Sequence, residues 1–598
     1  MKIAIVKKLQ YNNSNFKYFS NKMYLSEKIT HKLNNVKKIL FQKSSLTIIA
    51  VIFLGIFLRT YHFSSGLLFE IDQSYDTRIV SNAVEQGIGN LPLLGPTAGG
   101  GRALRLGPAF YYMQYASAKI FGNKPVGHAM LVLIFSILAI PLFYFFCRNY
   151  FSEKISLPLL ALFSASFFMI VYGRFSWSPN VLPFLIIATF YALLKSIHAE
   201  KNKECWFLLT VFLISVTSQI HFNSFFTIPT ISFLFLAYKR PRFKLKIWLL
   251  AIGIVLLAYS PMILNDFKTN GENIGFFLKK ISKGGSPQKN IFQKTALDLN
   301  YISSEFLFIN TAADHVNGKR LVGTGFKNDA NLKWHIIAIL IFLIEIFFLV
   351  FNFFKEKNSL RKDFLLIVLL WIILPFLYFY SLLSGNFHMY PRFFLLLAPL
   401  PFILLGILFE KMLTLNKRIG FLVVSMLSIF LLFLNLSETK NYFSFINGKI
   451  PKDAEVARED VFPNTNRLTL KEQLAITNYI KSIAVINNYP VFISTYGEYE
   501  PIFWYHLSRL GINYTDKFDA KNATSKGNYF LIKYFNIGTR EINNEFEIMN
   551  KKNFGVLTVY TLKPLSTMQN SQSSSPKKLL QTIQIEELIK WKDLLTKK

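Results

Sequence analysis

Three carboxylates stand within seven residues, in the segment Glu70-Ile71-Asp72-Gln73-Ser74-Tyr75-Asp76. Asp72 and Asp76 lie four positions apart, so they share one face if the segment is helical, whereas Glu70 points elsewhere. A carboxylate that loops shield from water can have a raised proton affinity and act as a general base. The alternative is a solvated helix end, whose acids accept hydrogen bonds from free backbone N–H groups.

Arginines and a further acid follow, each with a structural alternative. Arg102 and Arg105 stand in a Gly- and Pro-rich stretch and could hold a phosphate through their planar donors, or contact lipid head groups. Asp266 is a third candidate catalytic acid, or a helix cap. The other candidate ligands for donor phosphate or substrate are Tyr111, Tyr112, Arg174, Asn180, Gln219, His221, His388, Tyr390 and Arg392.

Two of these residue types often have structural roles. Arg174 can extend its charge out of an apolar layer, with Trp177 as an interfacial anchor. A lone histidine is more often structural than a ligand, because metal sites need several converging ligands. The spacing of these residues demands no cofactor. A divalent metal held by Asp266 with His221 or His388 is left open.

The elements that must position these residues are apolar. About eleven segments, each roughly 17–22 residues long, can span a hydrocarbon core of ~30 Å. We therefore predict a polytopic α-helical membrane protein, with spans near 45–63, 127–147, 155–173, 180–197, 205–220, 222–238, 246–264, 334–354, 363–384, 392–411 and 419–436.

Positive charge sets the predicted orientation. With the Lys-rich N-terminal segment inside, every second connection should be basic. These connections contain Arg148, Lys154, Lys195, Lys201, Lys203, Lys239, Arg240, Arg242, Lys244, Lys246, Lys355, Lys357, Arg361, Lys362, Lys411, Lys417 and Arg418. The outer side then receives the loops 64–126 and 265–333 and everything after 437, so the acidic cluster lies outside.

The composition argues against other classes. The chain has 598 residues, 52% of them hydrophobic, and a formal net charge of +33. Nucleic-acid binding is a poor fit because the basic residues sit beside the membrane, where anionic lipids attract them. Cys147 and Cys205 flank basic connections, which argues against a disulfide. No small-residue cleavage site follows the first span, so we expect a retained helix in the cytoplasmic (inner) membrane.

We predict four regions along the chain. They are a basic cytoplasmic segment at 1–44, a transmembrane catalytic domain at 45–436, a small extracytoplasmic α/β domain at 437–565, and a polar linker with an amphipathic tail at 566–598. The helix of that tail is expected at 577–596. In the α/β domain, alternation of apolar residues predicts strands at 491–494, 529–532 and 555–562, and a helix is expected at 497–510.

The order of the motifs resembles membrane glycosyltransferases of the GT-C superfamily. The similarity is to family 39-like proteins, which are related to protein mannosyltransferases and aminoarabinose transferases. The matching segments run in collinear order over roughly residues 45–412, and they are EIDQSYD, LPLLGPT, LGPAFYYM, RFSWSPNVLPF, SQIHF, YSPMILNDF and YPRFFLLLAPLPF.

The resemblance implies a sugar donor linked to a polyprenyl phosphate, with Asp72 as the catalytic base. Relatives often carry an arginine where this chain has Tyr75, so the partner of Asp76 stays open. Many relatives also have an acid where this chain has Gln73, and its absence here favours Asp72 as the sole base. The implied reaction transfers the sugar with inversion to an extracytoplasmic acceptor, which is a lipid, a glycan or a protein. Arg174, Arg392 or an arginine of the first outer loop would stabilise the departing phosphate.

Two other functions compete with this hypothesis. A transporter or flippase for lipid-linked sugars would show inverted repeats and charges near the midplane, but the sequence shows no repeat and its notable polar residues cluster at one surface. A scaffold with the outer domain as its binding part would hardly need so many polar groups at the helix ends.

Overall fold

The computed structural model describes residues 43–97, 104–282, 290–312, 315–316, 319–320, 332–382, 389, 391–447, 468–512, 514–516, 518, 523, 526–535, 545–565 and 588–595. The chain divides into two units, residues 1–55 and residues 56–598. Every candidate site residue belongs to the second unit.

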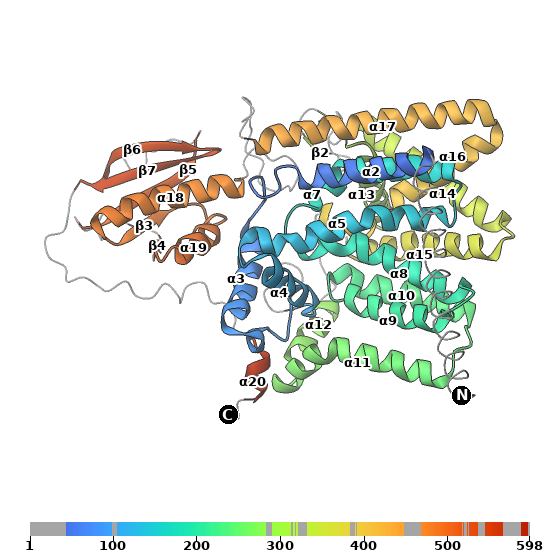
Figure 1. Ribbon diagram of the computed structural model, residues 1–598, viewed down its shortest axis with the longest axis horizontal. Coiled ribbons are helices and arrows are strands. Elements are labelled where there is room, and N and C mark those ends of the chain that lie inside the picture. The colour runs from blue at the N-terminus through green and yellow to red at the C-terminus, as the bar shows by residue number, and fades with distance from the viewer. Residues whose placement is uncertain are drawn as a thin grey trace, which may run out of the picture. The chain divides into compact units, whose positions relative to one another are not determined.

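Apolar helices form the larger part of the fold drawn in Figure 1 and hold about half of the described residues. They are α2 (Lys43–Thr60), α5 (Pro125–Arg148), α6 (Glu153–Ala165), α7 (Phe167–Tyr172), α8 (Leu182–His198), α9 (Lys203–Thr217), α10 (Phe222–Lys239), α11 (Leu245–Lys268), α14 (Leu332–Lys355), α15 (Ser359–Leu382), α16 (Leu400–Leu415) and α17 (Lys417–Ile446). Each predicted span falls on one or two of these helices.

Six of the described helices are long and apolar enough to cross a membrane, by length and composition. Two of the other predicted spans are interrupted. The first breaks at Ser166, whose hydroxyl donates a hydrogen bond of 3.1 Å to the carbonyl of Ile309. The second breaks before Pro399, between a 3₁₀ helix, η5 (Pro391–Leu396), and α16, because proline lacks the N–H that a continuous helix needs. The full number of spans stays a prediction.

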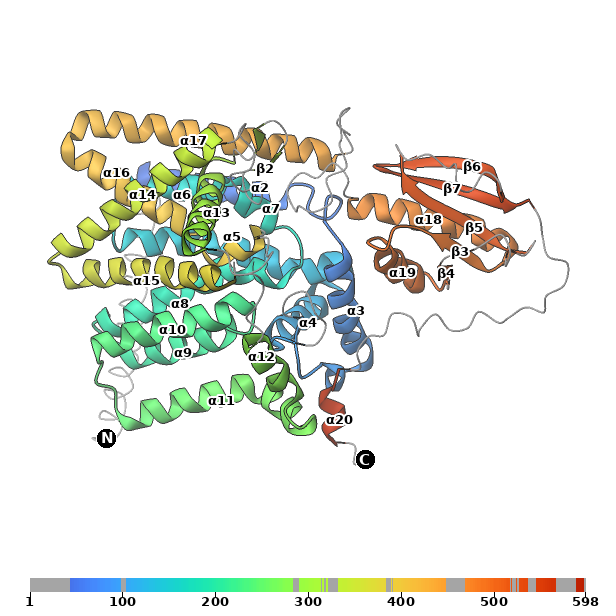
Figure 2. The ribbon, with the colours of Figure 1, turned by 180° about the vertical axis from the view of Figure 1, so that it is seen from behind.

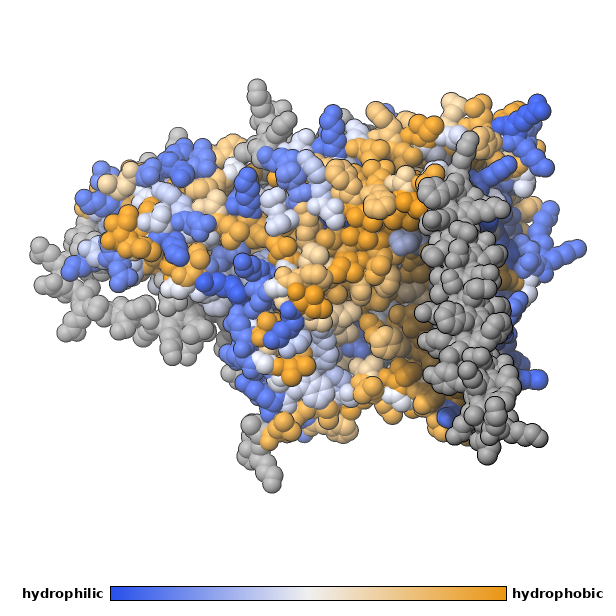
Figure 3. Space-filling model, in the orientation of Figure 1, coloured by the Kyte–Doolittle hydropathy of each residue, from blue (hydrophilic) through white to orange (hydrophobic). Residues whose placement is uncertain are grey.

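Hydrophobic side chains gather on the outside of these helices (Figure 3). Leu257 of α11, Phe347 of α14 and Phe433 of α17 are 76%, 60% and 66% exposed. A contiguous apolar surface of this kind is unfavourable in water and suits contact with lipid. Together with the candidate spans, it identifies an integral membrane protein.

The first predicted outer loop contains helices and a tight strand-like pairing. Its elements are α3 (Ile71–Gln86), a 3₁₀ helix η1 (Ile88–Asn90), and α4 (Ala109–Phe121). Gly95 N–H donates to the carbonyl of Leu106 at 2.8 Å. A Cβ atom on Gly95 would stand 2.1 Å from the carbonyl oxygen of Gly107, so this close approach of two chain segments requires glycine.

The second predicted outer loop also forms helices, α12 (Glu272–Ser282) and α13 (Ile291–Thr311), followed by a short hairpin of β1 (His315–Val316) and β2 (Lys319–Arg320). The sequence indicated no helix at α13. This helix packs against α14 although its buried side chains include Asp298, Asn300 and Glu305. Those polar residues lower its hydropathy and hide it from a search for apolar segments.

A five-stranded sheet follows the bundle among the described residues, with the strand order β4-β3-β5-β7-β6. The central strand β5 pairs in parallel with β3 and antiparallel with β7. The elements are α18 (Leu470–Asn487), β3 (Val491–Ser494), α19 (Glu500–Arg509), β4 (Tyr514–Asp516), β5 (Asn528–Tyr534), β6 (Phe546–Phe554) and β7 (Leu557–Pro564). The predicted strands correspond to β3, β5 and β7, and the predicted helix is α19. The edge strand β6 escaped prediction because most of its residues are exposed and polar.

The described end of the chain returns to the first predicted outer loop. Residues 589–591 pair with residues 91–93, and α20 (Trp591–Leu595) begins there. Within the predicted amphipathic tail helix at 577–596, residues 577–587 and 596 lie outside the described residues, and the described part is helical only at α20.

Candidate active site

Helix α3 begins with a reciprocal cap. The Glu70 N–H donates to Gln73 Oε1 at 3.0 Å, and the side chain of Glu70 in turn accepts from the backbone of Gln73. This arrangement satisfies N–H groups that would otherwise lack partners at a helix start. It places Asp72 in the first turn and Asp76 one turn later, on the same face.

Asp76 lies in the protein interior beside Tyr111 of α4. The Tyr111 hydroxyl donates a hydrogen bond of 2.7 Å to Asp76 Oδ1, and the carboxyl is 6% exposed. Burial raises the pKa of Asp76 from 3.8 to about 7. The hydrogen bond from Tyr111 and the charge of Arg105 oppose this rise, whereas the charge of Asp72 adds to it.

Asp72 meets two groups from distant segments. Solvent reaches its side chain, yet enough protein surrounds it for desolvation to raise its pKa. The charge of Arg392 and a hydrogen bond from the Trp177 side chain act against that rise. The Arg392 guanidinium lies 5.3 Å from the ring centroid of Trp177, so a carboxylate, an indole and an arginine converge. The sequence pattern placed Trp177 only as an interfacial anchor.

Asp266 supports Arg105 through Asn273. Asp266 Oδ1 accepts hydrogen bonds from the N–H groups of Asn273 and Ile274 at 3.0 and 3.2 Å, at the start of α12. The Asn273 amide then bonds both backbone groups of Arg105, at 3.0 and 3.2 Å. This is the cap alternative for Asp266, and it leaves the carboxylate occupied by backbone donors. Asn273 has no signal in a single sequence, because its partner lies 168 positions away.

Two further predicted ligands occupy structural positions near these groups. His221 caps α10, where its Nδ1 accepts from the Asn223 N–H at 3.3 Å, and its ring lies 5.7 Å from that of Phe393. Burial and the charge of Arg392 lower the pKa of His221 to about 3, so the imidazole is neutral. Gln219 Nε2 donates to carbonyls of α9 and α11, at 3.0 and 3.1 Å.

Arg174 is used by the backbone of α2. Its guanidinium is 2% exposed and donates to the carbonyls of Leu58, Arg59 and Tyr61 at 3.3, 2.8 and 2.7 Å. Carbonyls at a helix C-terminus lack partners within the helix, and a cation there also complements the helix dipole. Arg174 thereby fixes the turn that presents Trp177, and Asn180 Nδ2 fixes the same turn by donating to the Phe175 carbonyl at 2.9 Å.

Tyr112 binds other partners than its neighbour Tyr111. Its hydroxyl donates to the Pro92 carbonyl at 3.0 Å and accepts from Trp591 Nε1 at 2.8 Å. The Leu93 N–H donates to the Ile589 carbonyl at 2.8 Å. The end of the described chain therefore supports α4, which carries Tyr111 to Asp76.

Three predicted site residues, Arg102, His388 and Tyr390, lie outside the described residues. The others fall into two groups. Contacts or charge link the first group, which consists of Asp72, Asp76, Tyr111, Arg105, His221 and Arg392. The second group holds the surrounding backbone and consists of Tyr112, Arg174, Asn180, Gln219 and Asp266. Among the described residues, no three His, Cys, Asp or Glu side chains are placed to hold a metal ion.

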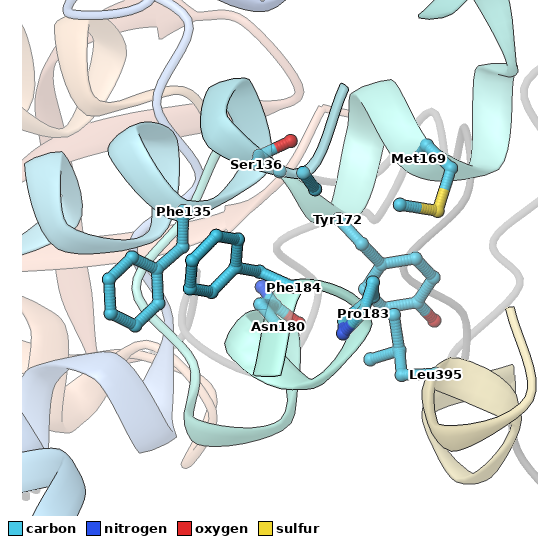
Figure 4. Close-up of a pocket in the computed structure, with 10 residues that line it drawn as sticks. Phe135, Ser136, Met169, Tyr172, Asn180, Pro183, Phe184 and Leu395 are labelled. Atoms are coloured by element: carbon cyan, nitrogen blue, oxygen red, sulfur yellow. The ribbon is translucent and has the colours of Figure 1, made fainter. Parts of the chain in front are cut away.

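A small cavity adjoins the turn that carries Trp177. Figure 4 shows Ser136, Tyr172, Asn180 and Phe184 around it, and it has room for about one water molecule. In the described part of the chain, the buried Asn180 Oδ1 has no hydrogen-bond partner. The cavity suits a bound water and is too small for a sugar.

Comparisons with known proteins agree with this architecture. Residues 106–264 match the family described as dolichyl-phosphate-mannose-protein mannosyltransferase. The structure of ArnT from Cupriavidus metallidurans in the apo state is similar, with a TM-score of 0.51 and 10% identity over 86% of this chain and 97% of that chain. ArnT from the same organism bound to undecaprenyl phosphate gives a TM-score of 0.49 and 11% identity, over 88% and 99% of the two chains.

Among curated proteins, no sequence matches the chain. At 10% identity the structural similarity establishes the fold alone, which is the helical GT-C fold of ArnT. The family match covers the end of the first predicted outer loop, from residue 106, and the helices up to 264. Fold and family match agree with the resemblance found in the motifs: the chain has the helical fold of ArnT, and its residues 106–264 are similar to the dolichyl-phosphate-mannose-protein mannosyltransferase family.

Proposed function

We propose that the chain is an inverting glycosyltransferase. It moves a sugar from a polyprenyl-phosphate donor to an extracytoplasmic acceptor, which is a lipid, a glycan or a protein. The observation that carries this proposal is the position of Asp72, which solvent reaches and which lies within range of the Arg392 charge and the Trp177 side chain. The family matched by residues 106–264 is named for a polyprenyl-phosphate-linked sugar donor, which supports the same donor class here.

The proposed reaction is a single displacement. An acceptor hydroxyl or amine transfers its proton to the Asp72 carboxylate as its oxygen or nitrogen bonds to the anomeric carbon of the sugar. The bond from that carbon to the phosphate oxygen breaks, and its electron pair leaves with the phosphate. Arg392 stabilises the charge that develops there, and attack from the face opposite the leaving group inverts the anomeric configuration.

The second carboxyl, Asp76, acts on Asp72 through its charge. When both are ionised, each raises the proton affinity of the other, so ionised Asp76 makes Asp72 a stronger base. Tyr111 and Arg105 keep Asp76 ionised closer to neutral pH than burial alone would allow.

We further propose the predicted orientation and all of the predicted spans. Helices α3, α4 and α12 lie together at one end of the bundle in both ribbon views (Figures 1 and 2). Lys239, at the end of α10, pairs with Asp363, near the start of α15, at 2.7 Å, so two connections predicted to be inside meet each other. This agrees with an inner N-terminus and an outer sheet domain.

The test uses purified full-length protein and a panel of polyprenyl-phosphate sugars. We expect transfer or hydrolysis of at least one donor, and a fall of about 10²–10⁴-fold in rate for Asp72→Asn. Asp266→Asn is the matched control, because asparagine keeps an oxygen to accept the two backbone hydrogen bonds at α12, and it should retain most of the rate. Equal rates for Asp72→Asn and the unaltered protein would remove Asp72 from the mechanism. Movement of an intact donor across vesicle membranes without turnover would favour a flippase.

A further inference from the structure

Arg78 lies on the face of α3 that turns away from the carboxylates. It is two positions after Asp76 and six after Asp72, which at 3.6 residues per turn places its side chain about 160° and about 120° around the helix from theirs. Its guanidinium carbon lies 4.5 Å from the ring centroid of Trp504 in α19 and 5.7 Å from that of Tyr75. Arg509 of α19 also bonds Glu85 near the end of α3, at 3.1 Å, so α19 follows this face.

Two nitrogen atoms of Arg78 are buried without use. Within the described part of the chain, neither Nε nor Nη2 has a hydrogen-bond partner. Burial of an unpaired donor is unfavourable, and native structures contain few such groups. Burial lowers the pKa of Arg78 to about 10, which still leaves the guanidinium charged at neutral pH.

Arg59 shows how the same chain satisfies a buried guanidinium with a structural role. Arg59 is 0% exposed, and its Nε, Nη1 and Nη2 donate to Ser136, Ser164 and Phe163 at 2.8, 2.7 and 3.4 Å. The stacking of Arg78 on Trp504 uses the face of the guanidinium and leaves its edge unpaired. Arg174, which also has a structural role, leaves Nε unpaired but donates through Nη2. Arg78 differs from both arginines because neither atom of this edge has a partner among the described residues.

The unpaired atoms form a particular shape. Nε–H and Nη2–H are the two parallel donors of the side-on edge of an arginine, and this edge matches two oxygen atoms of a phosphate or a carboxylate. The cations proposed to serve the donor phosphate, Arg392 and Arg105, act on Asp72 and Asp76. Arg78 is therefore separate from them and takes no part in the displacement described above.

We propose that the side-on edge of Arg78 is an oxyanion site between α3 and α19, and that it binds a phosphate or carboxylate group of the acceptor. The inference rests on the proposed function and narrows it to an anionic acceptor. Trp504 holds the guanidinium flat, and the side chains over its edge must shift to admit the anion. The acceptor would then lie against the same helix that carries the base.

The first experiment measures binding and needs no turnover. Purified full-length protein is melted in rising concentrations of inorganic phosphate at constant ionic strength. The starting variant is Arg392→Gln, which weakens the proposed donor-phosphate site, so the remaining stabilisation reports Arg78. The phosphate midpoint is the phosphate concentration that gives half of the maximal rise in melting temperature. We expect this midpoint to rise at least about tenfold when Arg78→Gln is added. The same rise is expected with Arg78→Lys, which keeps the charge but lacks the planar pair of donors.

The same titration can overturn the proposal. Identical midpoints for Arg392→Gln with and without Arg78→Gln would show that no anion binds at Arg78. Arg78→Lys keeps this comparison available if the glutamine variant does not fold. Repeating the titration with acetate identifies the preferred group, because the anion with the lower midpoint is the better fit.

Lipid head groups are a second source of phosphate, and nanodiscs separate them from an acceptor. The phosphate midpoint is compared between phosphatidylglycerol and phosphatidylcholine nanodiscs, with and without Arg78. A higher midpoint in phosphatidylglycerol that depends on Arg78 would assign the site to a lipid head group, and it would overturn the proposal that the site binds the acceptor. If turnover is established, Arg78→Gln should raise the KM for the acceptor at least about tenfold, with a smaller change in the KM for the donor. If the protein proves not to be a glycosyltransferase, the binding result at Arg78 still stands, because the phosphate titration needs no turnover.

Discussion

The side-chain amide of Gln473 donates a hydrogen bond of 2.7 Å to the backbone carbonyl of Phe69, which lies 404 positions earlier. Gln473 is 0% exposed, and its Oε1 lies 3.1 Å from His506 Nε2, which must therefore carry the hydrogen. The Phe69 ring packs on that of Tyr505 at 5.0 Å. The sheet domain thus holds the backbone three residues before Asp72.

Gln473→Leu should slow the reaction without touching the reacting groups. The change leaves the Phe69 carbonyl and the His506 N–H buried and unpaired, at a cost of about 1–3 kcal/mol each in folding free energy. We expect kcat to fall about tenfold with little change in the donor KM, because α3 loses its anchor. The measurement is steady-state kinetics beside thermal unfolding.

Lys471→Ala is the matched control for that variant. Lys471 bonds the Ser65 carbonyl through its backbone N–H at 3.2 Å, so its exposed side chain is not part of the anchor. If Gln473→Leu is fully active despite a lower melting temperature, this contact of the sheet domain contributes to stability and does not position α3 for catalysis.

Tyr111→Phe should move the acid limb of the pH–rate profile. The Tyr111 hydroxyl lowers the pKa of Asp76, whose value is about 7, so loss of the hydroxyl raises that pKa further. Asp76 is then protonated at a higher pH, so the acid limb of the kcat/KM profile shifts upward by about one pH unit. Tyr112→Phe serves as the control, since Tyr112 bonds Pro92 and Trp591. Superimposable profiles for the two variants would exclude Asp76 as the group on the acid limb.

Asp76→Asn should stabilise the protein, with a dependence on pH. A carboxyl whose pKa is raised from 3.8 to about 7 binds its proton more tightly in the folded state than in the unfolded state. The folded protein therefore loses stability as pH rises from about 4 to 7, by at most about 4 kcal/mol in total. We expect a higher melting temperature for the variant at pH 8 and little difference at pH 4. A constant difference at both pH values would contradict the raised pKa.

Arg174→Gln and Arg392→Gln should separate structure from catalysis. Arg174 donates to three carbonyls at the end of α2, so its loss should lower the melting temperature strongly. Arg392 acts on the carboxylate of Asp72, so its loss should lower kcat by about 10²-fold or more with a small effect on melting. The reverse pattern would assign the departing phosphate to Arg174.

The sequence predicted what local patterns encode. Apolar runs located the helices of the bundle, and the spacing of Asp72 and Asp76 placed them on one face of α3. The helix α13 was missed because Asp298, Asn300 and Glu305 are polar yet buried, a burial that only the packed bundle can supply. A hydropathy scale scores each residue by its type, so it does not include the residues that surround it in the folded protein.

The roles of the site residues depend on contacts that spacing does not encode. Asp266 had two readings of equal standing, acid or cap, and the two backbone N–H groups on its Oδ1 favour the cap. Trp177 had an ordinary explanation at a membrane surface, and only its meeting with Asp72 across the fold gives it a further role. Gln473 and Asn273 act over 404 and 168 positions, where a single sequence carries no signal.

The order of synthesis gives the return of residues 588–595 a further meaning. These residues leave the ribosome after the whole bundle and the sheet, yet they pair with the backbone of Leu91 and Leu93 and bond Tyr112 through Trp591. During translation and membrane insertion, the segment around Leu91 and Leu93 therefore lacks its last strand-like partner. The nascent protein completes the support of α4 only after the bundle and the sheet have been made. A bulky insertion close behind residue 595 would therefore disturb a segment that was synthesised long before it.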